Sequence, residues 1–320
     1  MIPADKNDAN DALLDRAQGV LYGQFIGDSL GSLVEWMSPH EIEADYPDGV
    51  RELVDGGPHG LLAGQPTDDS EMALALARSL VSLGSFDLDD IRGAYERWMR
   101  SEPFSVGQTC RAALTGGYMS PDSQANGALM RISPLAVFGA GRPADADGSI
   151  AEAATEDAKI THINPLCTAV NATYVLTLTR IVREGLTRDA AVDTLQSVAR
   201  EYGSPEVEDL VERGLQAPPA DFVQQMGWVT IAFTNAVYEL AHGDSIEESL
   251  VRTVRQGGDT DTNAAICGAL LGGLYGAEAI PARWRETIDT CKAYPGTLRP
   301  RPEEYWPADA SQLARSLLAL

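Results

Sequence analysis

The sequence predicts an all-α fold of about a dozen helices in a chain of 320 residues. Apolar residues recur at three- and four-residue spacing in most segments, which is the period of a helix with one buried face. Alternating runs of β-branched residues, which are typical of strands, are nearly absent. No fixed-period repeat and no linker-like stretch divides the chain. A hydrophobic content of 44% is enough for a large buried core.

Residues 1–10 are expected to form a flexible tail, and residues 11–320 a single domain. Each helix of this domain is predicted from its apolar spacing, and several from a capping residue at the start. The predicted helices are 11–35, 67–83, 88–100, 107–114, 126–138, 151–159, 165–183, 188–202, 207–216, 227–241, 245–255, 263–275, 282–290 and 309–320.

Glycines mark two features of the first part of the chain. Gly23, Gly27 and Gly31 recur every four residues on the first predicted helix, which allows a neighbouring helix or a ligand to approach closely. Five glycines and two prolines lie within residues 47–65, so this segment is expected to be a loop. The loop ends at Thr67, which is expected to cap the next helix.

The charge of the chain excludes some classes of partner. The formal net charge of −23 at pH 7 argues against binding to a nucleic-acid backbone or to an anionic membrane surface. The most apolar run, 264–280, is short for a membrane span and is interrupted by Glu278. The four cysteines are scattered, as in reduced, buried thiols, and no secretory signal is visible. We therefore expect a cytoplasmic protein.

Two acidic motifs far apart in the sequence carry the chemistry. Thr67-Asp68-Asp69 and Asp259-Thr260-Asp261-Thr262 each place two carboxylates and a threonine hydroxyl at the start of a predicted helix. Each motif alone is also explained as an N-cap followed by acids that complement the helix dipole. Two such motifs in one chain favour a shared binuclear site for Mg²⁺ or Mn²⁺, because hard oxygen ligands suit these ions.

Glu35 belongs to the same hypothesis. With the four aspartates of the two motifs it would bring five negative charges together, and two like charges 4 Å apart cost about 4 kcal/mol at an effective dielectric constant near 20. Two divalent ions would nearly cancel these charges. Such a pair of ions can hold neighbouring oxygens of a substrate and activate a water. A vicinal diol, such as a ribose, and a phosphate are both suitable substrates, and the acids do not choose between them.

Four further features have a structural and a functional interpretation. Asn126-Gly127-Ala128 could open a helix whose free N–H groups bind an anion, but an ordinary loop is preferred on sequence alone. Met130 is expected in the core and Arg131 in an ion pair. For His162 and Trp228 the structural interpretations, a satisfied histidine and a core aromatic, are preferred over contacts with phosphate, ribose or a base.

Taken together, these motifs resemble the ADP-ribosylglycohydrolase family. The resemblance extends from about Leu14 to Trp284, with the motifs in the order of the family. The motifs are Gly27-Asp28-x-x-Gly31, Thr67-Asp68-Asp69-Ser70, Asn126-Gly127-x-x-Met130-Arg131, Thr161-His162 and Gly257-Gly258-Asp259-Thr260-Asp261-Thr262.

The resemblance implies a single compact orthogonal multi-helix bundle that carries two Mg²⁺ or Mn²⁺ ions and removes ADP-ribose from modified proteins. It implies a catalytic role for Glu35, Asp68 and Asp259. The implied metal ligands are Thr67, Asp68, Asp69, Asp259, Asp261 and Thr262. The implied diphosphate and ribose contacts are Asn126, Gly127, Ala128, Met130 and His162, and Trp228 is implied to stack on adenine.

The sequence departs from the family pattern at two positions. Ser70 replaces a threonine and keeps its hydroxyl. Ser105 stands where arginine-directed relatives carry an aspartate that acts at the scissile ribose, so the acid role could have moved to Glu102 or Glu35.

We therefore predict a metal-dependent hydrolase whose partners are an ADP-ribosylated protein, with arginine as the preferred acceptor, and the product ADP-ribose. One alternative is the same chemistry on another conjugate, such as serine, O-acetyl-ADP-ribose, a nucleic acid or a small molecule. A second alternative is a non-catalytic protein that binds ADP-ribose or neutralises a toxin.

Overall fold

The computed structural model describes residues 6–319, in which the chain forms fifteen α-helices and no strand. The all-α prediction is confirmed. The helices are α1 (Lys6–Gly31), α2 (Pro39–Asp45), α3 (Asp68–Leu83), α4 (Leu88–Arg100), α5 (Gln108–Leu114), α6 (Ser133–Ala140), α7 (Asp147–Lys159), α8 (Pro165–Glu184), α9 (Arg188–Tyr202), α10 (Pro205–Gln216), α11 (Val229–His242), α12 (Ile246–Val254), α13 (Thr260–Tyr275), α14 (Ala282–Thr290) and α15 (Ala310–Leu317).

The first helix begins and ends at other residues than the sequence predicted. Helix α1 begins at Lys6, within the segment expected as a tail, and residues 1–5 lie outside the described part of the chain. It ends at Gly31, so Glu35 lies beyond the helix. The short helix α2 was not expected. Ser38 and Glu41 form a reciprocal capping box at its start, a local signal that the sequence does carry.

The helix predicted over 126–138 is wrong in its first half. Residues 126–132 form tight turns, and α6 begins only at Ser133. The N–H of Asn126 donates to the carbonyl of Gly227, so this segment is tied to the chain before α11. An Asn-Gly pair favours a turn, which accounts for the difference. The interpretation of 126–128 as a helix N-terminus that binds an anion therefore fails.

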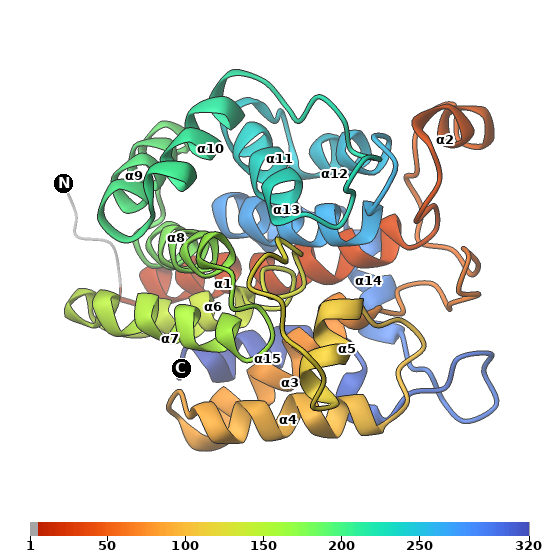
Figure 1. Cartoon of the computed structure of the whole chain (residues 1–320), viewed down its shortest axis with the longest axis horizontal. Coiled ribbons are helices and arrows are strands. Elements are labelled where there is room, and N and C mark those ends of the chain that lie inside the picture. The colour runs from red at the N-terminus through yellow and green to blue at the C-terminus, as the bar shows by residue number, and fades with distance from the viewer. Residues whose placement is uncertain (1–5, 320) are drawn as a thin grey trace.

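Helices α1 and α13 form the centre of the molecule (Figure 1). A Cβ on Gly23 would overlap the carbonyl of Gly268, and a Cβ on Gly19 would overlap that of Gly272, so the two backbones are in contact. The pairing is antiparallel, because later residues of α1 meet earlier residues of α13. The end of α1 therefore lies beside the start of α13, which brings the segment with Glu35 next to Asp259.

The other helices surround this central pair. Helices α9 to α12 lie on one side in Figure 1 and α3 to α5 on the other. Helices α11 and α12 pack against α13, whereas α3 packs against α4, α6 and α15. All four cysteines are buried and free, as expected from the sequence. Within residues 6–319, no helix is both long and apolar enough to cross a membrane.

Candidate active site and metal centre

The acids of the two motifs meet at one cavity of about 530 Å³. The predicted site residues that line it are Glu35, Asp68, Asp69, Ser105, Asn126, Gly127, Met130, His162, Asp259, Asp261 and Thr262. Thr67, Ala128 and Trp228 are predicted site residues that do not line it. The two halves of the chain therefore contribute acids to a common space, as the shared-site hypothesis requires.

The start of α13 depends on the two glycines before it. Gly257 and Gly258 have φ values of +73° and +76°, a region that other residues rarely adopt. A side chain on Gly258 would also overlap the carbonyl of Phe222. This turn directs Asp259, at the N-cap of α13, and Asp261, in its first turn, towards the cavity.

Asp28, Asp69 and Asp261 form the first group of acids. One carboxylate oxygen of each lies within 4.8 Å of the others, and all three residues are buried. Burial raises the pKa of Asp28 to about 7, and it raises the pKa of Asp69 and of Asp261 well above the usual range. Oδ1 of Asp69 is buried without a hydrogen-bond partner in the described structure. A buried acceptor in this state is one that a bound cation can satisfy.

Asp28 is buried on the apolar side of α1, and the sequence interpretation did not include it among the ligands. Its carboxylate accepts hydrogen bonds from the N–H of Thr67 at 3.1 Å, from the hydroxyl of Thr67 at 2.9 Å and from the N–H of Ser70 at 3.1 Å. Thr67 is the N-cap of α3 but makes no side-chain capping bond, because its hydroxyl points to Asp28 and Asp69. Asp28 thus fixes the start of α3.

Glu35, Asp259 and Asp261 form the second group, and Asp261 belongs to both. Nδ2 of Asn126 donates to Oδ2 of Asp259 at 2.7 Å and fixes the orientation of this carboxylate. Burial raises the pKa of Asp259 to about 6. Two acid groups that share one member are compatible with two neighbouring cation sites.

Asp68 lies at the cavity wall outside these two groups. Its Oδ2 accepts a hydrogen bond from the N–H of Gly107 at 3.2 Å. Burial raises the pKa of Asp68, and the Ser105 hydroxyl and the Gly107 N–H oppose this rise. The two acid groups offer carboxylate oxygens, and the hydroxyl of Thr262 lies at the same cavity. This donor set fits a hard divalent cation such as Mg²⁺ or Mn²⁺.

Glu35 has a partner that the sequence interpretation missed. Nε2 of His59 lies 2.6 Å from Oε2 of Glu35, and both side chains are buried. His59 comes from the glycine-rich loop over 47–65, and Gly57 and Gly60 beside it have positive φ. The apolar residues of this loop do not recur at a regular spacing, so the sequence carried no sign that His59 would reach Glu35. Only the glycine content indicated that the loop has an unusual backbone conformation.

His162 is buried at the cavity wall. Burial, with the charge of nearby Arg131, lowers its pKa to about 3, so the ring is neutral at pH 7. Arg131 donates to Oγ1 of Thr161, which lies 2.7 Å from Nδ1 of His162. Which of the two atoms donates the hydrogen bond between Thr161 and Nδ1 depends on the tautomer of the ring. Nε2 is buried and has no hydrogen-bond partner within the described residues, and His162 lines the cavity.

The remaining predicted residues support or flank the cavity. Arg131 is fully buried and forms an ion pair with Asp157 at 3.0 Å, in agreement with the expected ion pair. Ala128 is buried behind the wall. Trp228 is 36% exposed at the N-cap of α11, so it is not the core residue that the sequence alone favoured. Met130 is buried in the core and also borders the cavity.

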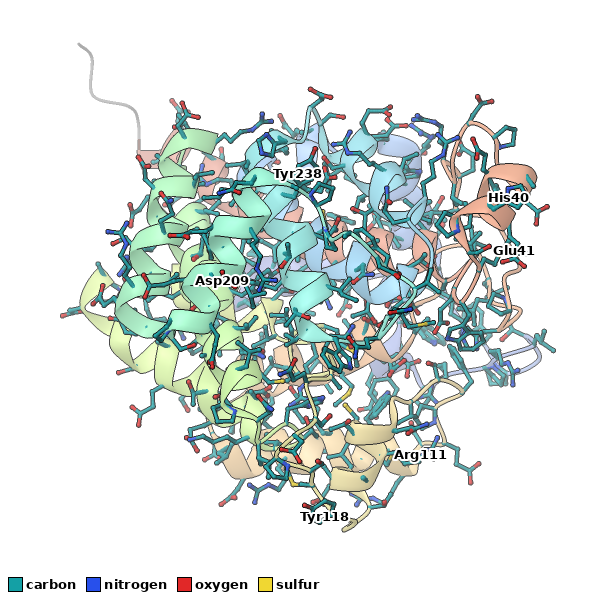
Figure 2. The ribbon with its side chains drawn as sticks, turned by 45° about the horizontal axis from the view of Figure 1, so that its top comes forward. His40, Glu41, Arg111, Tyr118, Asp209 and Tyr238 are labelled. Carbon is teal, nitrogen blue, oxygen red and sulfur yellow. The ribbon has the colours of Figure 1, made fainter. Side chains whose placement is uncertain are left out.

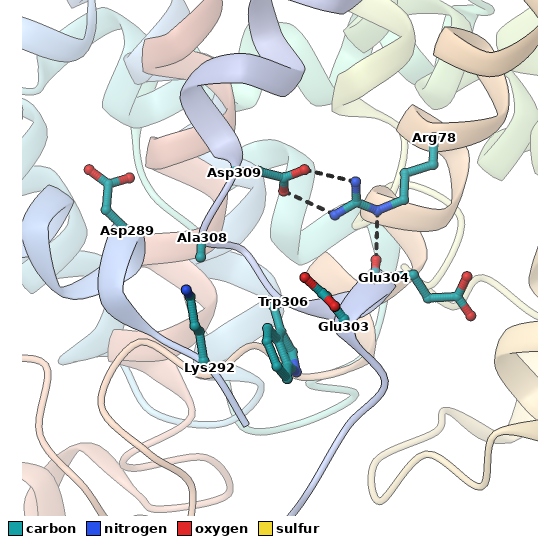
Figure 3. Close-up of a pocket in the computed structure, with 8 residues that line it drawn as sticks. All are labelled: Arg78, Asp289, Lys292, Glu303, Glu304, Trp306, Ala308 and Asp309. Carbon is teal, nitrogen blue, oxygen red and sulfur yellow. Dashed lines mark hydrogen bonds and ion pairs between the residues drawn. The ribbon is translucent and has the colours of Figure 1, made fainter. Parts of the chain in front are cut away.

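A second hollow, of about 550 Å³, is shown in Figure 3. In it Arg78 forms two hydrogen bonds with Asp309, beside Trp306 and Lys292. None of the acids of the two groups lines this hollow. It is therefore separate from the candidate metal centre.

Comparison with known proteins identifies the family of the chain. A family model described as ADP-ribosylglycohydrolase matches residues 9–318. The chain belongs to the ADP-ribosylglycohydrolase family. It is a hydrolase, and the family resemblance seen in the sequence is confirmed.

Two relatives in the ADP-ribosylglycohydrolase family match most of the chain. The ADP-ribosyl-[dinitrogen reductase] glycohydrolase of Rhodospirillum rubrum is 33% identical over 288 residues, which cover 86% of this chain and 90% of that protein. The ADP-ribosylarginine hydrolase of Pseudomonas putida is 29% identical, with coverage of 86% and 74%. A solved structure, described as an ADP-ribosylglycohydrolase-related protein complex, matches with a TM-score of 0.76 and 29% identity, and covers 97% of this chain and 99% of that chain.

Proposed function

We propose that the protein is a divalent-metal-dependent hydrolase that removes ADP-ribose from modified protein side chains, with arginine as the preferred acceptor. The observation that carries this proposal is the pair of acid groups that share Asp261 and border one cavity. Family membership and the name of the Pseudomonas putida relative support the chemistry and the acceptor.

The proposed ligands of two Mg²⁺ or Mn²⁺ ions are Thr67, Asp68, Asp69, Asp259, Asp261 and Thr262. The free Oδ1 of Asp69 supports its role as a ligand. Both oxygens of Asp28 already accept hydrogen bonds from the α3 start, so we assign Asp28 to positioning rather than to direct binding. When bound, such ions hold the vicinal hydroxyls of a sugar and supply the positive charge that activates water.

Glu35 is the proposed group that moves the proton. Its carboxylate lies at the cavity beside Asp259 and Asp261, where it can accept a proton from the attacking water or return one to the leaving group. The hydrogen bond from His59 holds one of its oxygens and leaves the other for this role. Asp68 and Asp259 contribute to catalysis by holding the reacting ribose in place.

The proposed diphosphate contact is Nε2 of His162, in the tautomer that carries the ring proton there. This nitrogen is buried and has no hydrogen-bond partner within the described residues, and His162 lines the cavity. Its neutral ring donates one hydrogen bond to a phosphate oxygen without the cost of a buried charge. Asn126, Gly127, Ala128 and Met130 shape the wall beside it. Trp228, half-exposed next to Gly227 at the cavity, is proposed to stack on the adenine.

The test is release of ADP-ribose from a protein that carries mono-ADP-ribosylated arginine. The purified protein is assayed with Mg²⁺, with Mn²⁺ and with EDTA, and Asp259→Asn serves as the inactive control. We expect release with either ion and none with EDTA. If no divalent cation supports release from this or any other conjugate, the proposed function is wrong.

Ser105 favours a second candidate function, which is the removal of ADP-ribose from an acceptor other than arginine. It provides a neutral hydroxyl at the cavity wall beside Asp68, where arginine-directed relatives are expected to carry an aspartate. Serine conjugates and O-acetyl-ADP-ribose are the substrates to compare. A higher kcat/KM on either than on the arginine conjugate would favour this candidate.

A further inference from the structure

Trp36 is an exposed aromatic residue at the wall of the acid cavity. It follows Glu35 directly, it lines the cavity, and 58% of its surface is exposed. A large apolar side chain that stays exposed inside a concave polar site is unusual, because burial in the core would be more favourable. The position of this ring therefore requires an explanation.

The backbone at Trp36 is held in an unfavourable conformation. Its φ is +69°, in the left-handed region that bulky residues rarely adopt. The N–H of Trp36 donates to the carbonyl of Gly258 at 2.8 Å, and the N–H of Gly258 donates to the carbonyl of Met37 at 3.0 Å. This pair of hydrogen bonds joins the Trp36 segment to the turn before Asp259. Backbone strain of this kind is concentrated at functional sites.

The indole of Trp36 is also held in place by a neighbouring aromatic ring. Its ring centroid lies 5.1 Å from that of His59 in an edge-on arrangement, and His59 in turn lies 5.5 Å from the ring of Phe104. A ring held in this way loses little freedom when a ligand packs on its exposed surface. Trp36 is therefore prepared for contact with a ligand rather than left free in solvent.

The chemistry of this part of the cavity suits a planar cation. The face of an indole attracts a cation, and a guanidinium also stacks on it through its flat shape. The carboxylate of Glu35, which is next to Trp36 in sequence and is not among the proposed metal ligands, favours the same charge. A neutral acceptor, such as a serine hydroxyl or an acetyl group, gains neither interaction.

We propose that Trp36 is a specificity-determining residue that stacks on the guanidinium of the acceptor arginine. This inference rests on the proposed function. According to this proposal, the ring of Trp36 gives the enzyme its preference for a cationic leaving group. Other residues of the cavity hold the ADP-ribose.

The test compares kcat/KM for an ADP-ribosyl-arginine protein and an ADP-ribosyl-serine peptide. Trp36→Asn removes the ring and keeps a residue that tolerates positive φ. We expect it to lower kcat/KM about 5- to 30-fold on the arginine conjugate, the range of a desolvated cation–π contact, and less than about 2-fold on the serine conjugate. Trp36→Gly should give the same result, and Trp36→Phe should retain most of the arginine activity.

Two aromatic residues provide matched controls. Tyr118, which is 79% exposed on the loop after α5 and labelled in Figure 2, is not at the cavity, so Tyr118→Leu should change neither substrate. Trp228→Leu should lower both rates in parallel, because both conjugates carry adenine. An equal effect of Trp36→Asn on both conjugates, or no effect on either, would overturn the inference. Failure of the wild-type protein on every conjugate would instead overturn the proposed function.

Discussion

Nε2 of His59 lies 2.6 Å from Oε2 of Glu35, and the pair is buried at the edge of the acid cavity. His59 is itself held in place, because its carbonyl accepts a hydrogen bond from Nε of Arg299 at 3.0 Å. Glu35 lies beyond the end of α1, where no helix fixes its side chain. This hydrogen bond therefore sets the direction of the carboxylate that we propose as the proton-transfer group.

We predict that His59→Leu lowers kcat about 10- to 100-fold with less than about a 2-fold change in KM, the loss expected when a hydrogen bond to a charged group is removed. His59→Gln keeps an N–H donor at a similar reach and should retain most of the activity. Steady-state kinetics on the arginine conjugate measures both variants. Equal losses in the two variants would contradict the assigned role.

The raised pKa values of the buried aspartates predict how the stability of the metal-free protein depends on pH. Burial raises the pKa of Asp28 to about 7 and of Asp259 to about 6, above the value near 4 of an unfolded aspartate. The folded protein therefore binds more protons than the unfolded chain between pH 4 and 7. The contribution of these groups to stability is complete below pH 4 and is lost as the pH rises through 6 to 7.

In EDTA we accordingly expect the melting temperature to fall between pH 5 and pH 8. Mg²⁺ or Mn²⁺ should raise it more at pH 8 than at pH 5, because cations compete with protons for the same carboxylates. Thermal unfolding at a series of pH values measures both effects. Asp28→Asn, which cannot titrate, should have a smaller pH slope than the wild type. An equal slope in the two proteins would count against the raised pKa.

Asp28→Asn should also lower metal affinity or activity about 10- to 100-fold, the usual effect of removing a residue that orients metal ligands. Asparagine has one acceptor oxygen where the aspartate has two, so it cannot hold both Thr67 and Ser70. Metal titration followed by the melting temperature measures the change. Asp87→Asn, at the N-cap of α4, is the matched control, because asparagine caps a helix as well as aspartate does.

The start of α3 is also held by a buried ion pair. Arg301 pairs with Glu71 through two hydrogen bonds of 2.7 and 2.8 Å, and Nε1 of Trp98 donates to the same carboxylate. Arg301→Met leaves the buried Glu71 charge unpaired and should lower the free energy of unfolding by about 3–5 kcal/mol. Adding Glu71→Gln should recover part of this loss. Urea unfolding measures the three proteins.

Arg78→Met is the control for this prediction. Arg78 forms the same bidentate pair with Asp309, but at the surface (Figure 3). An exposed pair contributes at most about 1 kcal/mol, so this variant should lose little stability. Equal losses for Arg78→Met and Arg301→Met would show that burial is not the cause.

The sequence predicted most of the fold because helical periodicity is local. Helix α9 begins and ends where expected, and most other boundaries move by only a few residues. The segment 126–132 was misassigned because its apolar residues were read as helical, whereas Asn126-Gly127 starts a series of turns. Backbone hydrogen bonds within the segment hold these turns, and the distant Gly227 anchors Asn126. The acid motifs were recognised because each stands at a helix start and each combines two aspartates with threonine.

The residues missed at the site are those whose role depends on distant contacts. His59 lies in an aperiodic loop, and only the folded chain brings it to Glu35. Asp28 did leave a signal, since it lies three residues after the buried Phe25 on α1, where a charge is unexpected. The exposure of Trp36 and its positive φ follow from hydrogen bonds to Gly258, which no local pattern encodes.

The glycine contacts between α1 and α13 have a consequence for ion selectivity. Asp28 on α1, which positions the start of α3, approaches Asp261 on α13 only as closely as these two backbones allow, and a methyl group on Gly23 or Gly268 would force the helices apart. Mg²⁺ requires short, nearly octahedral coordination, whereas a larger ion accepts a wider arrangement. We therefore expect the radius of an ion bound at the proposed centre to be controlled in part by residues that have no side chain and never touch it.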